Sequence, residues 1–169
     1  MDDPELRKEA QSAQRRASVR KVADDIFDFQ ETAKRSLGRH WPTRSASERD
    51  EFVKLFSDLL ERSYISKIET YGGEKIQYTA EKIDGDLATV STRIVTKNGT
   101  EVPVDYRMKK GGDRWLVYDV SIEGVSLVSS YRTQFNKIIQ TSSYNELVSK
   151  LRTKQDELLA EDKGQKKGK

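Results

Sequence analysis

Between residues 75 and 122 the chain alternates apolar and polar side chains with a period of two, interrupted at short intervals by turn residues. This alternation is typical of β-strands with one buried face, because successive side chains of a strand point to opposite sides of the sheet. Asp84-Gly85 and Asn98-Gly99 are hairpin signals, since both residues of each pair tolerate positive φ, and residues 109–113 make a looser turn. The segment therefore predicts four antiparallel strands joined by three hairpins, which is a meander.

One face of this predicted sheet is consistently apolar, because the more apolar residues of each strand fall on the even positions. A sheet with one apolar face must bury it, and the helices on either side of the segment are the available cover. The even-numbered residues are Ile76, Tyr78 and Ala80; Ala88, Val90, Thr92 and Ile94; Val102, Val104, Tyr106 and Met108; and Leu116, Tyr118, Val120 and Ile122.

Apolar residues at helical spacing flank the sheet segment on both sides. Before it, one stripe predicts a helix that ends at Gly38, and Ser45-Ala-Ser-Glu48 is a capping box that opens a second helix over about 46–70. After it, we expect a helix over about 125–139 and a last helix behind the capping pattern Ser143-Tyr-Asn-Glu146. The first stripe consists of Val19, Val22, Ile26, Phe29, Ala33 and Leu37; the second, which is wide, of Phe52, Val53, Leu55, Phe56, Leu59, Leu60, Tyr64 and Ile68.

This order of elements predicts an α+β fold, a four-stranded antiparallel meander with N- and C-terminal helices packed on one face. The 169 residues suit one domain. We expect a flexible N-terminus over 1–12, a single domain over 13–160 and a disordered basic tail over 161–169.

Composition excludes several classes of function. The absence of cysteine excludes disulfides, thiol catalysis and cysteine metal sites. With 31 Lys plus Arg against 28 Asp plus Glu, the net charge is +3, and outside the tail no concentrated basic stretch favours nucleic acid.

No apolar run is long enough to span a membrane. The first residues lack the apolar region of a signal peptide, which leaves open a cytoplasmic protein or a mature secreted protein without its leader.

Catalytic residues are scarce in this chain. His40 is its single histidine, and its place beside Trp41 at a helix end favours a capping or packing role. Asp119 lies in the most apolar strand, where it is either a general base at a cavity rim or the structural partner of an arginine such as Arg107 or Arg132. The pattern favours the structural pair.

Several stretches of the chain resemble the periplasmic lipid carriers of the Mla pathway, the toluene-tolerance family. In the helical half these are Leu37-Gly-Arg-His-Trp41, Ser47-Glu-Arg-Asp-Glu-Phe-Val-Lys-Leu-Phe56 and Leu59-Leu-Glu-Arg-Ser-Tyr64. In the sheet half they are Val102-Pro-Val-Asp-Tyr-Arg107 and the stretch from Trp115 to Val128, which runs into Tyr131-Arg-Thr-Gln-Phe135. The missing leader and the lysine-rich tail depart from the family pattern.

The resemblance implies a non-enzymatic periplasmic carrier that shuttles single phospholipids and maintains the lipid asymmetry of the outer membrane. Its partners would be an outer-membrane lipoprotein complex and an inner-membrane ABC transporter. The chain would be a monomer without cofactor, with phospholipid as cargo in an apolar pocket. An enzyme on a similar scaffold and an interaction module with a solid core are the alternatives. The candidate pocket residues are Phe52, Phe56, Leu60, Ile76, Tyr78, Val90, Ile94, Val104, Tyr106, Met108, Tyr118, Val120, Ile122, Val125, Val128, Tyr131 and Phe135.

Overall fold

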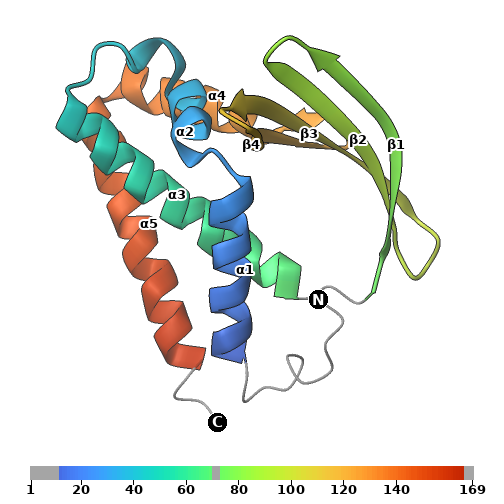
Figure 1. Ribbon diagram of the computed structural model, residues 1–169. Helices are drawn as coiled ribbons and strands as arrows, with labels where there is room; N and C mark the ends of the chain where they lie inside the picture. Colours follow the sequence, from blue (N-terminus) through green and yellow to red (C-terminus); the bar gives the residue numbers. More distant parts are fainter. Residues whose placement is uncertain (1–11, 70–72, 166–169) are drawn as a thin grey trace.

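A computed structural model describes residues 12–69 and 73–165 and places helices before and after the strand segment (Figure 1). The N-terminal elements are α1 (Ser12–Ile26), α2 (Phe29–Leu37), the short 3-10 helix η3 (Gly38–His40) and α3 (Ala46–Glu69). The strands are β1 (Lys75–Asp84), β2 (Leu87–Val95), β3 (Glu101–Gly111), β4 (Arg114–Ile122) and β5 (Val125–Ser126). The C-terminal helices are α4 (Leu127–Thr141) and α5 (Tyr144–Gln165).

The strands form one antiparallel sheet in the order β1-β2-β3-β4-β5, so the predicted meander and the α+β class are confirmed. Sequence analysis missed β5, a two-residue strand that pairs with the end of β4. Val125 lies in β5, and α4 begins only at Leu127, two residues later than predicted. The chain therefore makes one more short reversal at Gly124, where φ is 81°, before it enters the helix.

The main hydrophobic core is built from the helices together with Trp41, which follows η3, and contains no strand residue. Helix α3 lies against α5, and α2 lies against α4, with the sheet extending away from this bundle (Figure 1). Three phenylalanine rings meet at its centre, where the ring of Phe135 stands edge-on to Phe52 and to Phe56 at centroid distances of 5.6 and 5.1 Å. The buried members are Ala33, Leu37, Trp41, Phe52, Leu55, Phe56, Leu59, Leu60, Phe135, Tyr144, Leu147, Val148 and Leu151.

The N-terminal apolar stripe does not form one helix, as the sequence predicts, but two. The chain leaves the helical path at Phe27, which forms an isolated parallel bridge with Val117 of β4. The Asp28 N–H donates to the Val117 carbonyl at 2.8 Å, and the Asp28 carboxylate then caps α2 by accepting from the Glu31 N–H at 2.8 Å. The break occurs because these residues bond to the exposed edge of β4, which periodicity cannot reveal.

The predicted helix ends are confirmed at three places. Ser45 and Glu48 form a reciprocal capping box at the start of α3, and the Ser143 hydroxyl accepts from the Glu146 N–H at the start of α5. Gly38, with φ of 55°, ends α2. Helix α5 continues to Gln165, into the stretch 161–169 that the sequence predicts as a disordered tail, and residues 1–11, 70–72 and 166–169 lie outside the described part.

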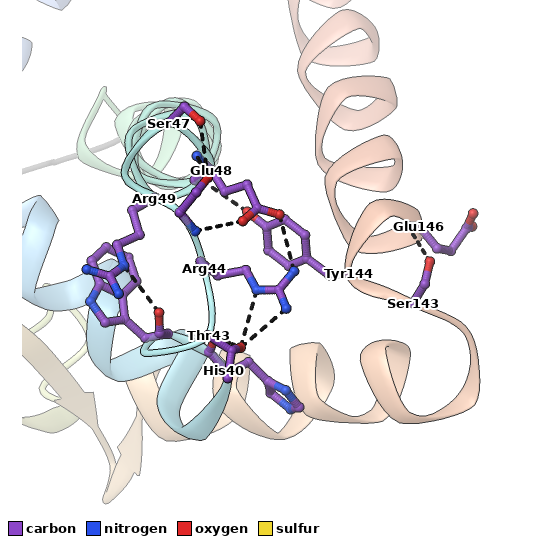
Figure 2. Close-up of polar contacts among 11 residues, drawn as sticks. His40, Thr43, Arg44, Ser47, Glu48, Arg49, Ser143, Tyr144 and Glu146 are labelled. Atoms are coloured by element: carbon purple, nitrogen blue, oxygen red, sulfur yellow. Dashed lines mark hydrogen bonds and ion pairs between the residues drawn. The ribbon is translucent and has the colours of Figure 1, made fainter.

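Tyr144 of α5 contacts both the first turn of α3 and the loop before it (Figure 2). The Tyr144 hydroxyl donates to the carbonyl of Glu48 at 3.0 Å, and the guanidinium of Arg44 lies 4.5 Å from the ring centroid. Arg44 also forms an ion pair with the Glu48 carboxylate at 3.2 Å. Burial, reinforced by the negative charge of Glu48, raises the pKa of Tyr144 to about 12. The neutral phenol is therefore the form that the fold stabilises.

Because the phenol is held neutral in the folded state, the stability due to Tyr144 is complete below its ordinary pKa of 10.0 and is lost as the pH rises through about 12. We expect Tyr144→Phe to lower the free energy of unfolding by about 1 kcal/mol at neutral pH through the lost hydrogen bond. The substitution should also make the free energy of unfolding fall less steeply above pH 10, because this tyrosine no longer titrates. Urea denaturation at neutral pH and above pH 10 measures the two changes. Tyr78→Phe, at a residue that is 80% exposed, is the control and should change stability at neutral pH by less than about 0.5 kcal/mol. Equal losses in both variants would contradict the assignment.

Candidate functional site

The register of the sheet brings the apolar residues of four strands onto one surface, which we call the apolar face. Residues directly opposite each other in adjacent antiparallel strands point to the same side. Val90, for example, lies opposite Tyr106, which lies opposite Val120. The members are Ile76, Tyr78, Glu81 and Ile83 of β1; Ala88, Val90, Thr92 and Ile94 of β2; Val102, Val104, Tyr106, Met108 and Lys110 of β3; and Trp115, Val117, Val120 and Ile122 of β4.

Two register shifts change which residues lie on the apolar face from the even-numbered set that the sequence predicts. In β1 the pairing slips between Tyr78 and Ala80, so Ala80 turns to the other side and Ile83 replaces it. In β4 Asp119 pairs with Arg107 but Val117 pairs with Met108, which leaves Tyr118 as an extra residue. Leu116 and Tyr118 consequently leave the apolar face, and Trp115 and Val117 take their places. An alternating sequence carries no signal for an inserted residue. The prediction that even-numbered residues lie on the apolar face therefore fails before the insertion.

The apolar face is buried around Val117 of β4 and Val104 of β3 and open along β1, and Ile122 at the end of β4 is 43% exposed. Val117 is 3% exposed and Val104 4%, whereas Ile76 is 49%, Ile83 57% and Tyr78 80% exposed. Between them Val90, Ile94, Tyr106, Met108 and Val120 are half-buried. Figure 1 shows why, since the helices adjoin β4 while β1 and β2 curve away from the bundle. A contiguous apolar surface of this kind on a folded chain marks a binding site.

Helix α1 carries two further exposed apolar side chains. Val22 is 54% and Ile26 41% exposed, and both belong to the helix that joins the edge of β4 through Phe27. Sequence analysis assigned them to the buried stripe of a single helix. With the break at Phe27 both side chains remain exposed.

The apolar face carries few polar groups. Burial raises the pKa of the Tyr106 hydroxyl, which lies near the side chains of Thr92 and Tyr78. The Thr92 hydroxyl donates to the Val104 carbonyl at 3.0 Å and is thereby satisfied. Glu81, on the exposed strand β1, is the one carboxylate on this face within the described residues. Such a surface can hold alkyl chains and offer a few hydroxyls, but it presents no acid–base pair.

The helical pocket candidates lie elsewhere. Phe52, Phe56, Leu60 and Phe135 are buried in the helical core, and Tyr131 packs against that core, so all five contribute to a solid interior. Tyr131 stands edge-on to Phe56 at 4.9 Å, and burial raises its pKa. Val125 is 64% exposed on β5, whereas Val128 and Tyr118 line a polar hollow on the opposite side of the sheet. A lipid-lining role for these residues stays a prediction.

Asp119 is a structural residue of the β4–α4 junction, as the sequence favours. Its carboxylate is 2% exposed and forms an ion pair with Arg107 at 3.2 Å. The same carboxylate accepts from the Ser126 hydroxyl at 2.7 Å and from the Val128 N–H at 3.0 Å. Three donors therefore satisfy the buried charge and fix the first turn of α4 against the sheet.

His40 makes a structural contact with α4, which lies 96 residues further along the chain, and no helix cap. Its Nε2 lies 3.0 Å from Oδ1 of Asn136, the same oxygen that accepts from Arg39 at 2.8 Å. These bonds join η3 to the outer side of α4. Within residues 12–69 and 73–165, no group of three or more His, Asp or Glu side chains is placed to hold a metal ion.

Comparison with known proteins gives three concordant findings. A family model described as "MlaC protein" matches residues 1–153. The chain is 29% identical over 120 residues to the "Intermembrane phospholipid transport system binding protein MlaC" of Haemophilus influenzae, which is 68% of this chain and 56% of that protein. It is 26% identical over 98 residues to the "Toluene tolerance protein ttg2D" of Pseudomonas putida, covering 53% of this chain and 44% of that protein. The chain thus spans about half the length of the curated relatives it matches.

The fold also matches a solved structure. This is a phospholipid-binding protein from Ralstonia solanacearum in complex with a phospholipid, with a TM-score of 0.79 and 26% sequence identity. The match covers 93% of this chain and 88% of that chain. The arrangement of helices and sheet described above is therefore shared with a protein whose structure holds a phospholipid.

The structural role of Asp119 can be separated from a catalytic one. Asp119→Asn places an amide N–H beside donors that need an acceptor, and we expect a loss of roughly 2–3 kcal/mol in the free energy of unfolding. Arg107 is 47% exposed, so Arg107→Gln should cost less than about 1 kcal/mol. Urea denaturation of both variants measures the difference. An Asp119→Asn variant of unchanged stability would contradict the structural assignment.

Proposed function

The chain belongs to the MlaC family, and from that premise we propose that it is a non-enzymatic carrier of phospholipid. The observation that carries the proposal is the apolar face, which remains half-open although the helices have a complete core of their own. The solved relative from Ralstonia solanacearum, in complex with a phospholipid, supports the same cargo.

The chemistry of the apolar face suits a carrier that must both take up and release its cargo. Burial of an alkyl chain contributes about 0.8 kcal/mol per CH₂ group, whether the chain enters a bilayer or a protein. A surface of Val, Ile, Met and aromatic side chains with few polar atoms offers an environment close to that of the bilayer. The lipid can then exchange with a membrane without a large net change in free energy.

We also propose the cellular setting that the family implies. The chain would work in the periplasm as a monomer and shuttle single lipids between an outer-membrane lipoprotein complex and an inner-membrane ABC transporter, and so maintain outer-membrane lipid asymmetry. The printed name of the Haemophilus influenzae relative, a binding protein of an intermembrane phospholipid transport system, supports this setting. In the described part of the chain, no helix has the length and apolarity that a membrane span requires.

Native mass spectrometry of the purified protein, followed by extraction and identification of lipid, tests the proposal. We expect phospholipid at about one molecule per chain, either co-purified or taken up from phospholipid vesicles. A protein that contains no lipid and takes none from vesicles would overturn the carrier function. The interaction module or the enzyme would then be the better hypothesis.

A bulky side chain at the centre of the apolar face should displace the cargo. Val90 lies there, opposite Tyr106, so we expect Val90→Trp to reduce bound phospholipid to below roughly one tenth by filling space that acyl chains need. Arg93→Trp is the matched control, since Arg93 lies on the same strand but on the other side of the sheet and is 54% exposed. Lipid content by mass spectrometry and folding by circular dichroism give the comparison. Full loading of Val90→Trp would show that the cargo does not lie on this face.

A further inference from the structure

The described residues form a hollow of about 470 Å³ on the side of the sheet opposite the apolar face. It lies where α2 and α4 meet β3 and β4, and we call it the cationic pocket. Four cationic side chains line it, Lys34 and Arg35 from α2, Arg107 from β3 and Arg132 from α4. Two carboxylates also line it, those of Glu31 and Asp119, so the lining carries an excess of two positive charges.

Both carboxylates of the cationic pocket are already neutralised from within the protein. Glu31 accepts from Arg35 at 2.8 Å and forms an ion pair with Lys109 at 3.3 Å. Burial raises the pKa of Glu31, but the bonds to Arg35 and Lys109 and their positive charges outweigh it, and the net pKa lies below 4.5. Asp119 is held by Arg107, as described above. Neither carboxylate is left to compensate another cation.

Lys34 and Arg132 are the cations that the protein does not neutralise. Both are exposed, and neither has an acidic partner among the residues that the structure describes. They lie on neighbouring helices, and Arg132 approaches Gly38 at the end of α2. Two unpaired positive charges at the rim of one hollow attract an anionic group from outside the molecule.

The shape and chemistry of the cationic pocket favour an acidic peptide over a phosphate ion. Phosphate sites typically present free backbone N–H groups at a helix start. Here the first N–H groups of α4 are occupied, because Val128 donates to Asp119 and Ser129 to Ser126. The cations are spread over three elements, and Trp41 and Pro42 add an apolar wall. Spread cations beside an apolar wall suit a chain segment in which carboxylates alternate with uncharged residues.

We propose that the cationic pocket is a docking site for an acidic segment of a partner protein, with carboxylates bound by Lys34 and Arg132. The cationic pocket lies on the opposite side of the sheet from the apolar face, so a partner can bind while the apolar face is occupied. The proposal does not depend on the identity of the cargo.

The test uses a fluorescein-labelled peptide of alternating Glu and Ala residues, with its Lys and Ala counterpart as the charge control. Binding is followed by fluorescence anisotropy, and the site is mapped from amide shifts in nitrogen-15 NMR spectra. The test variant is Lys34→Glu with Arg132→Glu. The matched control is Lys54→Glu with Lys137→Glu, which makes the same change in net charge at exposed residues outside the pocket.

We expect the acidic peptide to shift the amides of Lys34, Ser129 and Arg132, and the test variant to weaken its binding at least about tenfold. The control variant should lose less than about threefold. Phospholipid content should be unchanged in both variants, which reports that the fold and the apolar face are intact. Equal losses in the two variants, or no binding of the acidic peptide, would overturn the proposal. Inorganic phosphate that shifts the same amides and displaces the peptide at equal concentration would also overturn it and make the pocket a phosphate site.

Discussion

Strand β4 carries the hydrogen bonds that join the sheet to the helical bundle. On its outer edge the Val117 and Tyr118 carbonyls accept from the Asp28 N–H and the Thr32 hydroxyl at 2.8 Å each. At its other end Asp119 holds Ser126 and the first turn of α4. These bonds satisfy an otherwise open sheet edge, and they fix α2 and α4 to one strand. The sheet is therefore attached at one side and extends freely from the other.

The one-sided attachment explains how the molecule can be stable and still leave an apolar surface open. The helices bury their own aromatic centre of Phe52, Phe56 and Phe135, and this core does not require the sheet to close over it. Strands β1 and β2 gain their stability from pairing with their neighbours and not from a helical cover. Exposed apolar area remains unfavourable by roughly 25 cal/mol per Å². A ligand that binds this area in the folded chain, and does not bind the unfolded chain, would stabilise the fold by mass action.

Sequence analysis predicted the elements of the fold well, because period-two alternation, Asn-Gly and Asp-Gly turns and capping boxes are all local signals. It failed where a distant contact decides the local structure. The break at Phe27 arises from hydrogen bonds to Val117, far along the chain, and the extra residue Tyr118 arises from the pairing of β4 with β3. The side to which each residue points was therefore predicted correctly over β2 and β3, whereas in β4 the prediction holds for Val120 and Ile122 and fails before the extra residue. Trp115 and Val117 could not be found, since nothing in an alternating pattern marks where its phase changes.

The extra residue in β4 also changes which side chains of that strand lie on each side of the sheet. Without it, Tyr118 would lie with Val120 on the apolar face, and the strand would continue its alternation. With it, Tyr118 turns to the other side, where the Arg35 guanidinium lies 4.1 Å from its ring centroid, and Asp119 faces Arg107. The insertion thus turns Tyr118 away from Val120 and places its ring beside Arg35, on the side of the sheet that also carries Arg107. Because backbone pairing separates the two sides, a substitution that changes charge behind the sheet should leave the apolar side unaltered.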